Sequence, residues 1–199
     1  SYGTNAGTAT LTVTINDTTA PSPPMLTGSS LTNDSTPTWM GVAEASASVD
    51  VLNGGISLGQ VAVDMSGNYS FTSGTALSDG AYVITTTASD VSGNTSSASN
   101  SLTVVVDTNA PGVPTISASS PTNDSTPTFA GSAEAVSIVT VLSDGATLGQ
   151  TTADESGNYS FTSSVVFSDG SYTLTAIAAD SAGNISVPSD PISFVVDSV

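Results

Sequence analysis

The sequence predicts an all-β protein built from two antiparallel β-sandwiches in tandem. Three observations predict it. The chain repeats itself at an offset of 90 residues, apolar residues alternate with small or polar ones, and turn signals recur at intervals of about 8–12 residues. In contrast, no stretch shows the 3.6-residue periodicity of an amphipathic helix. We therefore expect short strands joined by tight turns throughout.

The internal repeat sets the expected domain organisation. Residues 18–107 align with 108–197 without a gap, and 47 of these 90 pairs are identical. We expect a tail at 1–16 that belongs to the last strand of a preceding module, a first module at 17–106 and a second at 107–199. The segments 17–106 and 107–199 are called module 1 and module 2 below. About 90 residues suffice for one hydrophobic core.

Alternation within module 2 predicts seven strands. Tyr172, Leu174, Ala176 and Ala178, for example, alternate with small or polar residues, as strand residues with one buried face do. The strands are expected at 113–119, 126–134, 137–143, 146–153, 157–163, 171–179 and 190–197, and 90 positions earlier in module 1.

Turn motifs refine the fold. Ser168-Asp169-Gly170-Ser171-Tyr172, repeated at 78–82, is typical of the tyrosine corner of Ig-like sandwiches, in which a Tyr hydroxyl bonds back to the backbone. Asp154 and its repeat partner Asp64 are expected in a tight hairpin. Trp39 lies on a predicted strand and is expected in the core, with a ligand-stacking platform as the alternative. The two modules are thus predicted to be seven-stranded Ig-like antiparallel β-sandwiches joined end to end.

Composition excludes many functions. The chain has no Lys, Arg, His or Cys and a net charge of −17. Without basic residues we expect no binding to nucleic acid, and without an 18-residue apolar run no membrane insertion. The residues needed for a zinc site, a Ser-His-Asp triad or a Cys nucleophile are missing. Carboxylates, hydroxyls, amides and carbonyls remain, and these are the ligands of Ca²⁺.

Repeated acids are expected to gather at the ends of the modules. In module 2, Asp107, Glu134 and Asp180 should meet at the end where the chain enters. Asp34 and Asp79 of module 1 should face the same junction, and the equivalent set in module 1 is Asp17, Glu44 and Asp90. Two carboxylates about 4 Å apart repel by several kcal/mol. Either these acids spread into water or a Ca²⁺ ion lies among them.

Several of these acids have an alternative role. Asp107 could cap a turn, and Glu134 and Asp180 could be solvated loop residues. Asp34 and Asp124 could bind Ca²⁺ or form Asx turns in the loop after the first strand, and the sequence leaves both roles open. Asp79 and Asp169 are better explained as turn residues of the tyrosine corner.

Five motifs carry a family resemblance. They are Asp-Thr-x-Ala-Pro (17–21, 107–111), Thr-Asn-Asp-Ser-Thr-Pro-Thr (32–38, 122–128), Gly-x-Ala-Glu-Ala (41–45, 131–135), Ser-Gly-Asn-Tyr-Ser-Phe (66–71, 156–161) and Asp-x-x-Gly-Asn (90–94, 180–184). In them the chain resembles the bacterial Ig-like repeats of large type I-secreted adhesins of the repeats-in-toxin class. The resemblance implies an extracellular extender segment at the bacterial cell surface, in biofilm settings, stiffened by junctional Ca²⁺ at Asp107, Glu134 and Asp180.

Three functions follow as hypotheses. The first is a calcium-stiffened spacer that holds a distal tip away from the cell, is monomeric, and has neighbouring Ig-like repeats of its own chain as partners. The alternative is an Ig-like binding module for a glycan or a host-surface protein. The third is an enzyme, for which only a carboxylate pair is chemically available. Because the candidate acids occur twice at repeat positions, we expect no enzymatic activity.

Overall fold

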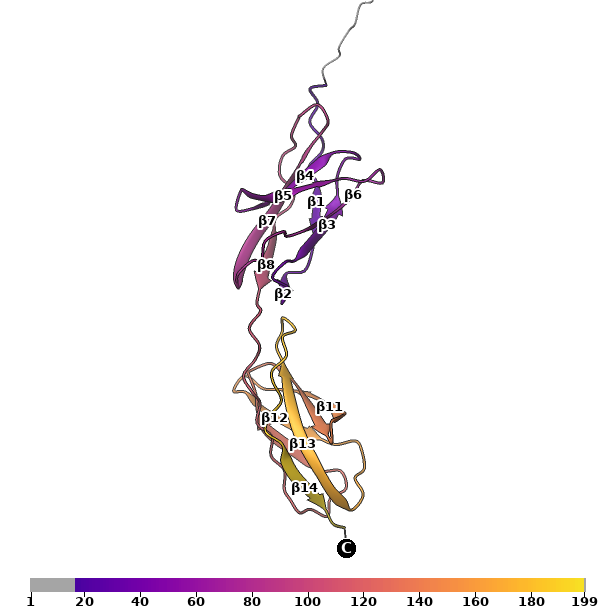
Figure 1. The fold of residues 1–199 in the computed structure, drawn as a ribbon, viewed down its shortest axis with the longest axis vertical. Helices are drawn as coiled ribbons and strands as arrows, with labels where there is room; N and C mark the ends of the chain where they lie inside the picture. Colours follow the sequence, from indigo (N-terminus) through magenta and orange to yellow (C-terminus); the bar gives the residue numbers. More distant parts are fainter. Residues whose placement is uncertain (1–16, 199) are drawn as a thin grey trace, which may run out of the picture. The chain divides into compact units, whose positions relative to one another are not determined.

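The structure is a computed structural model, and it describes residues 17–198. Strands and turns make up this range, and no helix long and apolar enough to span a membrane occurs in it. Figure 1 shows two sandwiches, the first formed by β1 to β8 and the second by β9 to β14. The predicted tail at 1–16 lies outside the described residues.

Module 1 is a sandwich of two sheets. The smaller sheet has the order β1-β3-β6, with β1 at Met25–Thr27, β3 at Thr38–Val42 and β6 at Asn68–Thr72. The larger has the order β2-β8-β7-β4-β5, with bounds Leu31–Thr32, Leu102–Val106, Gly80–Ser89, Ser48–Asn53 and Ile56–Ala62. All pairs but one with a given register are antiparallel; β2 and β8 run parallel.

Module 2 repeats this arrangement with fewer strands. Its smaller sheet pairs β9 (Thr128–Ser132) with β12 (Asn158–Thr162). Its larger sheet has the order β11-β10-β13-β14, with bounds Ala146–Thr152, Ile138–Ser143, Gly170–Ala179 and Ile192–Val196. Six of the seven predicted strands are confirmed within a few residues.

The first strand of module 2 is the exception. A strand was expected over 113–119, but only an isolated bridge between Ser117 and Ala130 forms there. Further along, Pro121 stands where module 1 has Leu31, the first residue of β2. In module 1 the Val105 N–H donates to the Ser30 carbonyl, whereas in module 2 the Val195 N–H donates to the Ser120 hydroxyl. The parallel pairing with the last strand accordingly shrinks to a bridge between Thr122 and Val196.

Each core is built around one aromatic residue, which lies on β3 in module 1 and on β9 in module 2. Trp39 is only 1% exposed and stacks on Phe71, with ring centroids 6.2 Å apart. Its repeat partner Phe129 is fully buried and meets Phe194 edge to face. Trp39 is thus a core residue, as predicted, and the alternative of a stacking platform is wrong because its faces are covered.

Two motifs explain how residues 25–27 are held against β3 in module 1, and residues 115–117 against β9 in module 2. The Tyr69 hydroxyl donates to the Met25 carbonyl at 2.8 Å. In module 2 the Tyr159 hydroxyl likewise donates to the Thr115 carbonyl. Space for this contact exists because residue 41 is glycine: a Cβ there would lie 1.9 Å from the Met25 carbonyl oxygen. The Gly of Gly-x-Ala-Glu-Ala and the Tyr of Ser-Gly-Asn-Tyr-Ser-Phe therefore act together.

The predicted turns are confirmed. The Tyr82 hydroxyl donates to the Ser78 carbonyl at 2.7 Å, and Tyr172 donates to Ser168 at 2.9 Å, which is the tyrosine corner. In the hairpin, one carboxylate oxygen of Asp154 accepts N–H groups of Ser156 and Asn158 at 2.9 and 2.8 Å. Asp64 repeats this pattern.

Candidate functional site

The Asp-x-x-Gly-Asn motif forms a closed loop at the end of module 2 where its chain begins, called the leading end. Asp180 Oδ1 accepts the N–H groups of Gly183 and Asn184 at 2.8 and 2.9 Å. Its other oxygen accepts the Asn184 side-chain amide at 2.8 Å. Partial burial opposes ionisation, but hydrogen bonds from the Asn184 side chain and backbone N–H groups outweigh it, so the pKa of Asp180 lies below its ordinary value.

Module 1 has the same loop. Asp90 accepts the N–H groups of Ser92 and Asn94 at 2.8 and 2.9 Å, and its second oxygen accepts the Asn94 amide at 2.8 Å. These bonds, the Asn94 side chain foremost, lower the pKa of the Asp90 carboxyl. Both loop acids are thus structural acceptors and remain ionised at neutral pH.

The asparagine of each loop also holds the first residue of its module. Asn184 Nδ2 donates to the Asp107 carbonyl at 2.8 Å, and Asn94 Nδ2 donates to the Asp17 carbonyl at 3.0 Å. One amide nitrogen thereby lies between a carboxylate oxygen and a backbone oxygen. In both modules, therefore, two oxygens converge on one point at the leading end.

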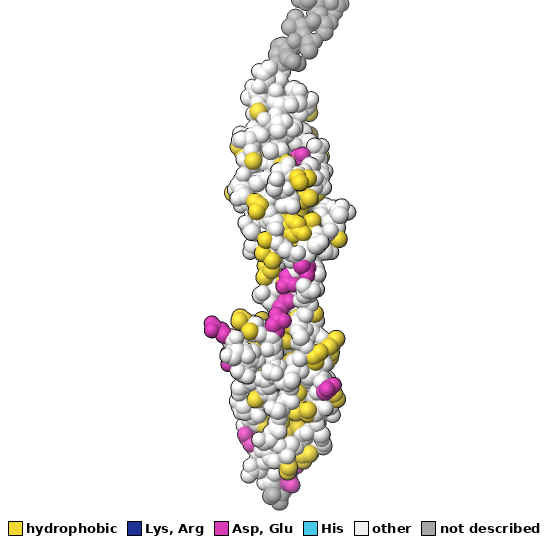
Figure 2. Space-filling view, turned by 90° about the vertical axis from the view of Figure 1, so that its left-hand side faces the viewer, with side chains coloured by type: hydrophobic (Ala, Val, Ile, Leu, Met, Phe, Trp, Pro, Cys, Tyr) yellow, Lys and Arg dark blue, Asp and Glu magenta, His cyan; other side chains and the backbone are white. Residues whose placement is uncertain are grey.

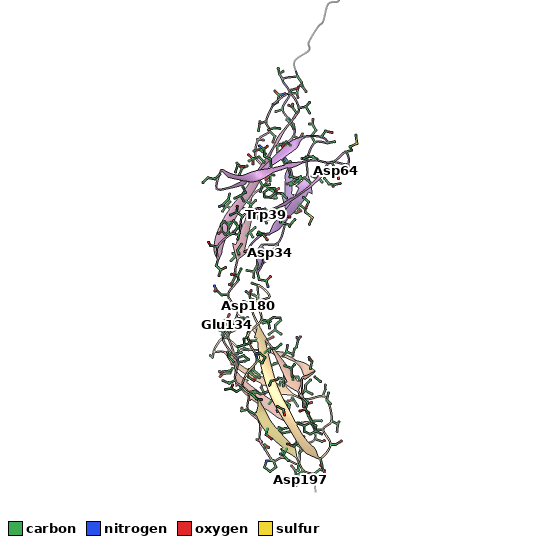
Figure 3. All side chains as sticks on the ribbon, viewed as in Figure 1. Asp34, Trp39, Asp64, Glu134, Asp180 and Asp197 are labelled. Atoms are coloured by element: carbon green, nitrogen blue, oxygen red, sulfur yellow. The ribbon has the colours of Figure 1, made fainter. Side chains whose placement is uncertain are left out.

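The glutamates of Gly-x-Ala-Glu-Ala lie in the neighbouring loop. Glu44 and Glu134 are exposed, and their backbone carbonyls close a turn by accepting the N–H of residues 47 and 137 at 3.1 Å. Figure 3 shows Glu134 and Asp180 at the leading end of module 2, with Asp197 at the opposite end. Sequence position thus predicted the end of the sandwich at which these acids lie.

At the opposite, trailing end, a second network recurs. Asp79 Oδ1 accepts the N–H and hydroxyl of Thr108 at 2.9 and 2.8 Å, and Asn109 donates to its other oxygen. Asp169 accepts the N–H and hydroxyl of Ser198 at 3.0 and 2.6 Å. Each tyrosine-corner aspartate therefore binds the residues that follow the last strand of its module, a role beyond that of a turn residue.

Two further pairs of acids cap local turns. Asp34 Oδ1 accepts the Thr36 N–H at 2.8 Å and the Thr36 hydroxyl at 3.0 Å, and Asp124 does the same with Thr126. Both residues therefore form Asx turns, one of the two roles left open, and the calcium role of Asp34 and Asp124 stays a prediction. Asp17 and Asp107 each accept the N–H two residues on, from Thr19 at 2.9 Å and Asn109 at 3.1 Å.

No group of three or more acidic side chains in residues 17–198 could hold a metal ion as the side chains stand. Figure 2 shows Asp and Glu side chains, and no Lys, Arg or His, among the described side chains on the face in view. Asp107, Glu134 and Asp180 therefore do not form the expected cluster of three carboxylates. The Asp107 carbonyl, rather than its carboxylate, meets the Asp180 loop. Calcium binding remains a prediction.

Sequence reasoning missed Asn94 and Asn184, which join the loop acid to the first residue of the module. It also missed Thr108 and Ser198 as partners of Asp79 and Asp169. The repeat held the signal, since Asp-x-x-Gly-Asn and the hydroxyl residue after the last strand occur twice. The repeat does not show which residues bond to each other, because the partners lie 77 and 29 residues apart in the chain.

The fold and the repeated end networks define a class: a tandem Ig-like module protein. The bacterial Ig-like domain model matches residues 24–108 and 115–198, so the chain belongs to this family and carries it in two tandem copies. No curated protein sequence matches the chain.

Among solved structures, the chain is similar to the fibronectin(III)-like modules of Clostridium thermocellum CbhA. Identity is 19%, with 86% of this chain and 94% of that one covered, and the TM-score is 0.54. It is also similar to the BSP domain of a biofilm associated protein (21%, 89% and 30% covered, TM-score 0.36) and to a tetra-tandem repeat in the extending region of a large adhesion protein (22%, 89% and 50%, 0.38).

Proposed function

We propose that this chain is a spacer segment of a large bacterial surface protein, extending a distal adhesive part from the cell. The observation that carries the proposal is the doubling of both end networks. Asp107 donates its N–H to Thr32 in module 1, and its carbonyl accepts Asn184 in module 2. The residues next to it, Thr108 and Asn109, bind Asp79. The connecting segment is therefore bound by side chains rather than free.

Repetition itself favours a spacer. The networks at the leading and trailing ends are the same in both modules, as units that serve one mechanical role in series require. The Ig-like sandwich is, moreover, an architecture that many cell-surface domains share, and this fold-level analogy is consistent with a structural role. Family membership and the five motifs support an extracellular place on the cell surface, with type I secretion as part of the proposal.

Calcium is the proposed stiffening ligand, and the leading-end donor set fits it. Asp180 Oδ2 and the Asp107 carbonyl both lie 2.8 Å from one nitrogen, Asn184 Nδ2. Turning that amide over would present its oxygen instead, so three oxygens would face one point, which is the ligand chemistry of Ca²⁺. Glu134, exposed in the adjacent loop, is the candidate to supply a further carboxylate. Asp90, Asn94, Asp17 and Glu44 form the equivalent set in module 1.

The stiffening is tested by spin-label distances, because the chain contains no cysteine. Gly74 and Ser164 are exposed repeat partners, and Gly74→Cys with Ser164→Cys places one label on each module. We expect the distance distribution to be broad in chelator and to narrow in millimolar Ca²⁺. An Asp180→Ala variant should stay broad in both. A distribution that ignores Ca²⁺ contradicts the calcium-stiffened spacer.

A further inference from the structure

An exposed apolar patch lies on the outer face of the smaller sheet of module 1. Met25 is 61% exposed, Met40 54% and Val42 46%. Met25 pairs directly with Val42 across β1 and β3, and Met40 lies two residues before Val42 on the same face. The three side chains are therefore neighbours, and together they are called the methionine patch.

Module 2 shows that the fold does not need this patch. Its residues at the same three positions are Thr115, Ala130 and Ser132. The other outward positions of β3 and β6 are unchanged between the modules: Thr38, Asn68, Ser70 and Thr72 recur as Thr128, Asn158, Ser160 and Thr162. On β1, Thr27 is replaced by Ser117, which is also a hydroxyl residue. The difference on this face of β3 and β6 is thus confined to the patch, and at each patch position module 1 has the larger apolar residue.

The surface around the patch is hollowed and has acids at its margin. One hollow is lined by Met40, Val61, Ala62 and Asp64, and a second by Met25, Val42 and Glu44. Val61 and Ala62 are also replaced by polar residues in module 2, Thr151 and Thr152. The two acids recur in module 2 as Asp154 and Glu134, so what is particular to module 1 at these positions is the apolar lining beside them.

These features select the occupant. A second copy of the chain would bring no Lys or Arg to Asp64 and Glu44, and two chains of charge −17 repel. A partner with apolar side chains flanked by basic ones would cover the patch and pair with both acids. Methionine side chains adapt readily to the shape of such a partner.

We propose that the methionine patch of module 1 is a docking surface for a protein segment that presents apolar side chains flanked by Lys or Arg. This surface adds a binding role to the spacer and does not depend on it. Because Glu44 also belongs to the proposed calcium set of module 1, peptide binding is measured in chelator. Module 2, which lacks the patch, would act as spacer alone.

The test uses the ε-methyl NMR signals of Met25 and Met40 in the whole chain. The probe is a short peptide of alternating Leu and Lys, with Ser–Lys and Leu–Glu peptides as controls for charge alone and apolarity alone. We expect saturable shifts of both methyl signals with the Leu–Lys peptide, and at least tenfold weaker binding of either control. Binding of the Ser–Lys peptide with equal affinity overturns the proposal.

The matched variant exchanges the patch for the residues of module 2: Met25→Thr, Met40→Ala and Val42→Ser. These residues occur at the same positions in a folded copy of the same sandwich, so the variant should fold, and circular dichroism checks this. We expect it to bind the Leu–Lys peptide about tenfold more weakly, measured by calorimetry. Equal affinity shows attraction by net charge only and overturns the proposal. The proposal is also overturned if the methyl signals of Met25 and Met40 shift with protein concentration in the absence of peptide. That result would identify a second copy of the chain as the occupant.

Discussion

Asn184 is a residue whose importance lies in two bonds from one amide, to the Asp180 carboxylate and to the Asp107 carbonyl. In the absence of calcium, Asn184→Ala should lower the free energy of unfolding by about 1–3 kcal/mol, because two acceptors lose their donor. Chemical denaturation in chelator measures this. Ser181→Ala, at an exposed position of the same loop, is the control. An unchanged stability would mean that the loop holds Asp107 without this amide.

Val136 is a residue whose replacement should stabilise the fold. It is a β-branched residue in a left-handed conformation, with φ of 66°. That conformation is unfavourable for a non-glycine residue and favours Asn among the alternatives. Val136 is 64% exposed, so little packing is lost on replacement. Val136→Asn should therefore raise the free energy of unfolding by about 0.5–1 kcal/mol. A lower thermal midpoint for this variant would contradict the strain argument.

Tyr159 gives a pH dependence with a definite sign. Burial raises the pKa of its hydroxyl to about 12, above the ordinary value of 10.0. Its contribution to stability is therefore complete below about pH 10 and is lost as pH rises toward 12. Thermal unfolding from pH 8 to pH 12 should show this loss, and Tyr159→Phe, already less stable at neutral pH, should show a smaller further loss. An equal alkaline loss in both proteins would assign it to other groups.

At the scale of elements, the end networks tie strand termini to loops distant in sequence. Asp169 accepts both the N–H and the hydroxyl of Ser198, beyond β14. Asp169→Ala should thus speed amide hydrogen exchange at Val196 and Asp197, while strands β10 and β11 keep their protection. Asp154→Ala, which removes the acceptor of a hairpin away from β14, is the matched control. Unchanged exchange at Val196 would show that strand pairing alone holds this end.

The elements also show what the sequence could predict. Alternation in segments such as 171–179 predicted strands because a half-buried strand must alternate, and the tyrosine corner followed from one motif. The first strand of module 2 was predicted wrongly, because the alternation that predicts β1 in module 1 recurs around Ser117, where only a bridge forms. The end of the sandwich at which Glu134 and Asp180 lie was predictable from loop order. The Asn184 bonds were not, since they join residues 77 positions apart.

At the scale of the whole molecule, one sandwich design is used twice, and what differs between the copies is informative. Core positions vary conservatively, as in Trp39 and Phe129, and the end networks are kept. The outer face of β3 changes from Met and Val to Ala and Ser. Shared features thus support the common spacer role, and the unshared patch supports a role of module 1 alone.

The measurement that tests the spacer account most directly is thermal unfolding of the chain in chelator and in about 5 mM Ca²⁺, with Mg²⁺ as control. Binding to the folded state with the affinity common for extracellular sites, about 10⁻⁴–10⁻³ M, stabilises by about 1–2 kcal/mol per ion. We predict a calcium-specific rise of the midpoint that Asp180→Ala reduces and that Glu155→Gln, an exposed acid outside the networks, leaves intact. No rise with Ca²⁺, or an equal rise with Mg²⁺, would contradict the account.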